Sequence, residues 1–251
     1  MKAASIPPPL TTAPTTPPFA SPASRGDAVA PGTDVRAAFR AAYENRYTWD
    51  PEFPGYRGRC VWEQSGSNGE PERREEGHFT VMADLKSQIE GLVDEAVHKA
   101  VASQLWEVTI HRVRRPFEQT HGANTFTAGD TDAVGTEVIV GGKGEGDRYR
   151  IKDNVVTMVH RHIHGTVVTI FTTAISDTGA GYLSHTYSSR YSDPASGAAR
   201  GGESRFTDTF VPVGAGGAWV LSERVVETDA ADASEGVVRQ VFRFEDLQLL
   251  G

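Results

Sequence analysis

The sequence contains a single cysteine and comparatively little positive charge, and both shortages exclude classes of protein. Cys60 has no partner for an internal disulfide, which favours a reducing compartment, and we expect it to be a small strand residue. Lys and Arg total 25 against 33 Asp and Glu, which gives a formal net charge of −8. Such a chain has few cations to neutralise nucleic-acid phosphates or anionic lipids, so we expect no nucleic-acid partner.

Long apolar runs and short catalytic signatures are also missing. The apolar runs fall far short of the ~18 residues that cross a bilayer, so we expect no membrane span. The HExxH pattern of zinc proteases and the Gly-x-Ser-x-Gly elbow of serine hydrolases do not occur. The residues therefore leave open whether the protein is an enzyme, and its oligomeric state is open as well.

Residues 1–32 form a Pro- and Thr-rich tail that we expect to be disordered, because it offers little apolar surface to offset the entropy of ordering. The successive Pro7, Pro8 and Pro9 are incompatible with the apolar core of a secretory signal peptide. We expect a cytoplasmic protein, or one of the chloroplast stroma if this hydroxyl-rich tail is a transit peptide.

Residues 33–251 are expected to form one α+β domain. A helix begins at Thr33 or Asp34 and ends before Pro51, and the aromatic turn WDPEFPGY that follows is expected to plug one end of the core. A long helix spans roughly 90–114. Strands are expected near 58–65, 76–86, 136–140, 148–152, 155–164, 167–176, 181–192, 203–213, 218–228 and 237–247.

The strands are joined mostly by short turns, and short links connect antiparallel neighbours. We therefore predict a meander of about ten strands in a strongly curved antiparallel sheet or open half-barrel. The N-terminal helix and the long helix are expected to pack on its concave side. Surface ion pairs of little energetic weight are expected across a hairpin, among Arg205, Asp208, Glu223, Arg224 and Glu227.

The segment VVTMVHRHIHGTVVTIFTT concentrates titratable side chains on an apolar background. His160, His162 and His164 follow one another at two-residue spacing, so on a strand they share one face. Two of them could hold a divalent metal together with a residue from a neighbouring strand, and the set we select is His160, His162 and His185. Alternatively the row lines a ligand cavity, or it is part of a sheet surface.

A second polar strand, YLSHTYSSRYSD, follows the histidine segment. Its His185 and Tyr187 are expected to share a face and to act as polar anchors of a cavity, with Arg161 beside them. Otherwise this is an edge strand whose polarity discourages pairing between sheets.

Several long segments resemble an uncharacterised family of cyanobacterial and plastid proteins, catalogued as a domain of unknown function (DUF3386). They are FRAAYENRYTWDPEFPGYRG, DNVVTMVHRHIHGTVVTIFTT, GYLSHTYSSRYSDP and RQVFRFEDLQLL, and the resemblance covers nearly everything after residue 33. It implies a photosynthetic source but no activity. The expected architecture also looks like the half-barrel of lipoprotein carriers, a likeness that does not carry function.

These observations favour a binding or carrier protein that holds a hydrophobic small molecule, such as a pigment, an isoprenoid or a lipid. The side chains expected to bind it come from the histidine segment and the second polar strand, and they are His160, Arg161, His162, His164, His185 and Tyr187. Two alternatives stay open. One is a metal-dependent enzyme that uses two of the histidines, and the other is an assembly factor for photosynthetic complexes.

Overall fold

The computed structural model describes residues 34–66, 71–230 and 236–251, so the tail that was expected to be disordered lies outside the described residues. The strands of the described chain form one sheet of twelve, more than the ten or so expected. In spatial order they are β3 (Ser87–Glu90), β2 (Pro71–Met82), β1 (Gly55–Ser65), β12 (Val237–Leu249), β11 (Ala218–Asp229), β10 (Ser204–Val213), β9 (Tyr182–Ser192), β8 (Thr166–Asp177), β7 (Val155–Ile163), β6 (Arg148–Lys152), β5 (Thr136–Gly142) and β4 (Asn124–Thr131).

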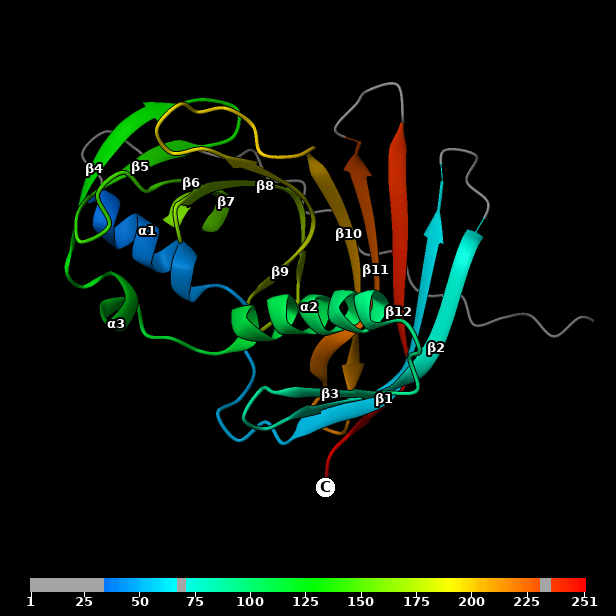
Figure 1. The fold of residues 1–251 in the computed structure, drawn as a ribbon. Coiled ribbons are helices and arrows are strands. Elements are labelled where there is room, and N and C mark those ends of the chain that lie inside the picture. The colour runs from blue at the N-terminus through cyan, green and yellow to red at the C-terminus, as the bar shows by residue number, and fades with distance from the viewer. Residues whose placement is uncertain (1–33, 67–70, 231–235) are drawn as a thin grey trace, which may run out of the picture.

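All eleven neighbouring pairs are antiparallel, and the first and last long strands, β1 and β12, pair with each other. The edges of this open sheet are therefore β3 and β4, which follow one another in the chain. The chain between them forms α2 (Glu95–Arg112) and α3 (Phe117–His121). The sheet curls around α2 and around α1 (Val35–Glu44), as Figure 1 shows.

The long helix begins later than its periodicity predicted. Residues 87–90 pair with β2 as the short edge strand β3, and Asp94 then caps the helix by accepting a hydrogen bond from the Ala96 amide at 2.7 Å. At the other edge, Thr125 and Phe126 pair with β5, although the strands expected after the long helix begin only at residue 136. Pairing with a neighbouring strand thus makes strands of both edge segments, because it satisfies backbone N–H and C=O groups that a loop would leave to solvent.

Two hydrophobic clusters fill the inner side of the sheet. The larger one joins the buried face of α2, including Val101 and Leu105, to strands on both sides of the β1–β12 pair. The smaller one packs α1 and α3 against β5, β6 and β7, with Phe39 fully buried at its centre. Each helix therefore shields a different half of the same sheet face.

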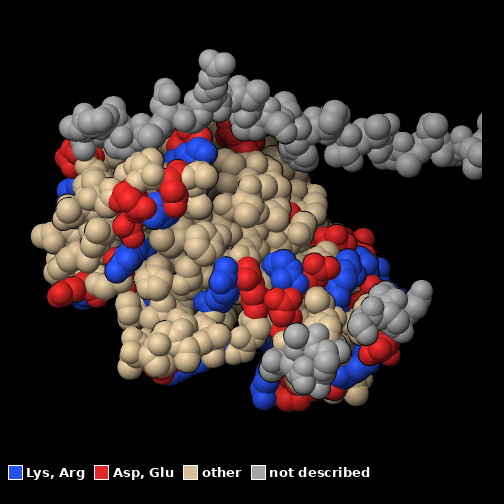
Figure 2. Space-filling view, turned by 90° about the horizontal axis from the view of Figure 1, so that it is seen from above, with Lys and Arg blue, Asp and Glu red and all other residues tan. Residues whose placement is uncertain are grey.

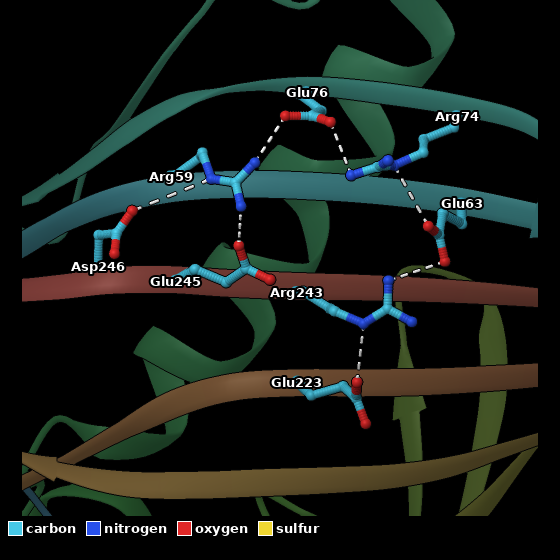
Figure 3. Close-up of polar contacts among 8 residues, drawn as sticks. All are labelled: Arg59, Glu63, Arg74, Glu76, Glu223, Arg243, Glu245 and Asp246. Carbon is cyan, nitrogen blue, oxygen red and sulfur yellow. Dashed lines mark hydrogen bonds and ion pairs between the residues drawn. The ribbon is translucent and has the colours of Figure 1, made fainter. Parts of the chain in front are cut away.

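The outer face of β2, β1, β12 and β11 carries a chain of ion pairs (Figure 3). Glu63 accepts from Arg243 at 2.8 Å and lies 3.3 Å from the Nε atom of Arg74, which in turn contacts Glu76. The face seen in Figure 2 is less charged, because a broad surface without Lys, Arg, Asp or Glu lies there between two groups of charged side chains. Charged side chains of both signs are thus gathered at the two sides of the face seen in that view.

Candidate ligand-binding groove

The register of β7 decides which way the histidine row points. Val159 packs against the inner cluster beneath α1, so its neighbour His160 projects from the opposite, outer face of the sheet. On that face His160 lies across from Arg148 of β6 and Thr169 of β8. His162 follows on the same face, and the two imidazole rings are 5.8 Å apart.

The His160 ring is partly fixed by its neighbours. Its Nδ1 atom lies 2.8 Å from the Thr169 hydroxyl, which leaves the Nε2 atom to contact a ligand. Desolvation, together with the nearby His162 and Arg148, lowers the pKa of His160 below its usual value. The ring is therefore neutral at pH 7 and can donate or accept a hydrogen bond according to its tautomer.

The other two histidines of the HRHIH segment lie at its far end. The His162 amide donates to the Asp147 carboxylate at 2.9 Å. His164 is exposed in the turn between β7 and β8, where its φ of 48° is the left-handed conformation of a tight turn. Only His160 and His162 therefore share a face as the two-residue spacing predicted.

Arg161 points to the inner side of the sheet, in line with the buried Val168 of β8. Its Nε atom donates to Asp147 at 3.2 Å. The buried Asp147, directly before β6, thus joins this strand to the end of β7 through the Arg161 side chain and the His162 amide. This role is structural, and it separates Arg161 from the histidines beside it.

A groove with a volume of about 500 Å³ opens on the outer face next to His160. Its walls combine apolar and charged side chains: Val134, Met158 and Phe171, together with Asp132, Glu137, Arg148, Arg150, His160 and Thr169. The volume lies in the range of small-molecule sites, which are commonly apolar clefts with a few polar anchors.

One wall of the groove is the link between β4 and β5, which side chains of β6 and β7 hold in place. Arg150 donates to the Gly135 carbonyl at 2.9 Å and contacts Asp130 and Asp132 at 2.8 and 3.1 Å. The Thr157 hydroxyl donates to the Val134 carbonyl at 2.8 Å. These bonds engage the Arg150 guanidinium, so Arg150 shapes the groove and is not available to a ligand.

Arg148, unlike Arg150, is available to bind a ligand. Its side chain is 57% exposed, and the ion pair that the structure describes for it is a long one, 3.5 Å to Glu137. An exposed, weakly paired guanidinium beside an apolar wall can exchange its partner for a ligand anion at little cost. Sequence reasoning missed Arg148, Met158 and Phe171, although their alternation with inward residues puts them on the histidine face.

Tyr187 lies on the inner face and belongs to a buried network. Its hydroxyl donates to Glu107 of α2 at 3.0 Å and accepts from Arg224 at 2.7 Å, and its ring stacks on Phe206 at 4.7 Å. Arg224 also pairs with Asp208, and both side chains are almost fully buried. The expectation that this was a surface ion pair is wrong, because α2 covers it.

His185 is not brought to the histidine row. The register places Arg190 on the cross-strand line of His160, and His185 lies five residues further along β9, about 16 Å at ~3.3 Å per residue. The expected metal set of His160, His162 and His185 is therefore not assembled. Within residues 34–66, 71–230 and 236–251, no group of three or more His, Cys, Asp or Glu side chains is arranged to hold a metal ion.

A family model described as "Protein of unknown function (DUF3386)" matches residues 30–250. The chain belongs to this family. A search of curated protein sequences finds no match. Among the described residues no helix is long and apolar enough to cross a membrane.

Two solved structures are similar to this chain. A LolA superfamily protein from Nitrosomonas europaea shares 9% identity over 88% of this chain and 95% of its own, with a TM-score of 0.33. A domain from Vibrio parahaemolyticus, named for outer membrane lipoprotein sorting, shares 8% identity over 85% of this chain and 90% of its own, with a TM-score of 0.30. TM-scores this low carry no argument about function.

Proposed function

We propose that this protein binds a small amphipathic molecule in the outer groove, with the apolar body on Met158 and Phe171 and an anionic group on Arg148. The observation that carries the proposal is the groove itself, in which the neutral His160 and the available Arg148 lie on neighbouring strands beside apolar walls. This is the arrangement of a site that holds its ligand by apolar contact and orients it by a few polar groups.

The proposal narrows the predicted hydrophobic ligand to an amphipathic one and moves it from a cavity enclosed by the curved sheet to the outer face. The anchors expected together are divided between the two faces of the sheet, so a single ligand cannot contact both His160 and Tyr187. Of the two, His160 borders a described cavity, whereas the Tyr187 hydroxyl is already engaged by Glu107 and Arg224. The outer face is therefore the better candidate.

Two fluorescent probes that differ mainly in one charge test the proposal. The anionic probe is 1-anilinonaphthalene-8-sulfonate, and the uncharged one is N-phenyl-1-naphthylamine. We expect Phe171→Ala to weaken both probes, because it removes an apolar wall. Arg148→Gln should weaken only the sulfonate, by about tenfold, as expected for a lost hydrogen bond to a charged group.

A matched control is His78→Ala, which changes an exposed histidine of β2 outside the groove. It should leave the affinity of both probes unchanged. Probe binding that neither Phe171→Ala nor Arg148→Gln alters would show that the groove is not the binding site.

A further inference from the structure

The inner side of the molecule carries a group of cations where α2 ends. Arg112 stands in the last turn of α2, and its carbonyl accepts from the Trp49 amide at 2.8 Å. The chain just before Trp49 is held to β9, because Arg46 forms a bridge with Tyr182. The segment 46–49 thus brings Arg46 and Arg112 to the same end of the fold, on the opposite sheet face from the groove.

The Arg112 guanidinium is buried and poorly paired. Only 8% of the residue is exposed, its Nη1 atom donates to the Tyr47 carbonyl over a long 3.4 Å, and within the described chain its Nε atom has no partner. A cation–π contact with Phe210, whose ring centroid lies 5.1 Å from the guanidinium carbon, offsets part of the cost of burying this charge. Burial lowers the pKa of Arg112 to about 10, and the Asp208 carboxylate, which is already paired with Arg224, opposes that fall. Arg112 therefore forms no ion pair of its own within the described chain, and a buried cation in this position favours a counter-anion.

A neighbouring donor is unpaired as well. The Tyr56 side chain is fully buried, and its hydroxyl also lacks a partner among the described residues. Burial raises the pKa of Tyr56, and Arg112 is near enough to oppose that rise. Two buried donors with unmet hydrogen-bonding capacity therefore lie in the same region.

His111, next to Arg112, marks where solvent reaches this region. The residue is exposed, and desolvation by the surrounding protein, followed by the charges of Arg112 and Arg46, lowers the pKa of its ring. Arg224 and Arg115 act in the same direction. The local field is thus positive on a chain whose formal net charge is −8.

We propose that the inner end of α2 is an anion-binding site, in which Arg112 and Arg115 receive a phosphate or carboxylate group beside His111, while Arg46, whose Nε atom donates to the Tyr43 carbonyl at 2.9 Å, adds positive charge nearby. The buried Arg112 Nε and Tyr56 hydroxyl are its candidate hydrogen-bond donors, and the exposed Arg115 draws the anion in from solvent. The site is separate from the groove and does not depend on the function proposed for it.

Inorganic phosphate is the probe, and sodium chloride at equal ionic strength is its reference. Binding is measured by calorimetry and by the imidazole NMR signals of His111 in the whole protein. Phosphate should raise the pKa of His111 by about one pH unit or more, because an anion beside the ring favours its protonated form. If phosphate moves this pKa no further than chloride does, the proposal fails.

Two adjacent exposed arginines provide a matched pair of variants. Arg115→Ala should weaken phosphate binding at least fivefold, whereas Arg114→Ala, which lies outside the group that acts on His111, should leave it unchanged. Equal losses in both would indicate only a general effect of net charge and would overturn the proposal. His160→Ala should leave the phosphate-induced change in the His111 signals unaltered, which separates this test from that of the groove.

The role of Arg112 as a buried donor is tested through the Tm, because a Tm is informative even for a variant of reduced stability. Phosphate should raise the Tm of the unmodified protein and should raise that of Arg112→Met much less. Equal increases would exclude Arg112 from the site. Hexyl phosphate then identifies the source of the anion, and its binding is read from the His111 signals because the groove would also take an amphiphile. Tighter binding than inorganic phosphate indicates the head group of an amphiphile, and equal binding indicates a free anion.

Discussion

Arg224 and Asp208 form a doubly hydrogen-bonded ion pair across β10 and β11, with Nε–Oδ1 and Nη2–Oδ2 distances of 2.7 and 2.6 Å. Their side chains are 2% and 1% exposed. Gln104 of α2 accepts a further bond from the same guanidinium at 2.9 Å. The pair therefore lies at the contact between the long helix and the sheet, where the loss of either partner removes the doubly hydrogen-bonded counter-charge of the other.

Asp208→Asn should lower the free energy of unfolding by roughly 3 kcal/mol, because it leaves the buried Arg224 with only the more exposed Glu107, 3.3 Å away, as a counter-charge. Urea denaturation followed by circular dichroism measures the change. The matched control is Asp229→Asn, which removes the exposed partner of Arg205 on the same hairpin and should have little effect. Similar losses in the two variants would contradict the special role of the buried pair.

Glu63→Gln should cost about 1 kcal/mol, since Glu63 joins Arg74 and Arg243 in the outer ion-pair chain and its own side chain is only 17% exposed. The cost should shrink in added salt, because dissolved ions screen these charges. Asp246→Asn, at the end of the chain of ion pairs with 80% of its side chain exposed, serves as the comparison and should be nearly neutral. A cost that does not change with salt would argue against an electrostatic origin.

His121 should make the protein less stable in acid. It is buried against Phe39 and Phe117, and desolvation, assisted by Arg161, lowers its pKa to about 4, against about 6.5 in an unfolded chain. Between these values the unfolded chain binds the proton more tightly, so stability falls as the pH falls, by at most about 1.4 kcal/mol per pH unit.

The matched measurement compares the protein with His121→Leu at about pH 7 and about pH 5. The unmodified protein should lose about 2 kcal/mol more than the variant over this interval, because only it carries the depressed histidine. Equal losses would show that His121 does not control the acid sensitivity.

Gly55→Ala should destabilise the protein by roughly 3 kcal/mol or more. Gly55 has a φ of +95°, and a Cβ atom there would overlap the Val81 carbonyl oxygen. Gly165→Ala provides the comparison, because its φ is +75° but nothing lies within 4 Å of the added atom, so only the backbone strain of about 1 kcal/mol remains. Thermal unfolding of both variants separates the clash from the strain.

The alternation of apolar and polar residues was sufficient to predict most of the long strands and the antiparallel meander, since strand periodicity is a local property. The aromatic turn was also predictable, and Trp49 and Phe53 do stack at 4.2 Å and are buried. The edge strands β3 and β4 were harder to predict, because short polar segments form strands only when a neighbour supplies their hydrogen bonds.

The sequence by itself determined that His160 and His162 share a face, because that follows from the two-residue period of a strand. Only the tertiary structure decided that this face is the outer one, since Val159 and not His160 meets the cluster beneath α1. The same applies to Arg224 and Asp208, whose pairing across a hairpin was predictable and whose burial was not. Burial depends on which distant segment covers a strand, and α2 does so here because it must pass from one sheet edge to the other.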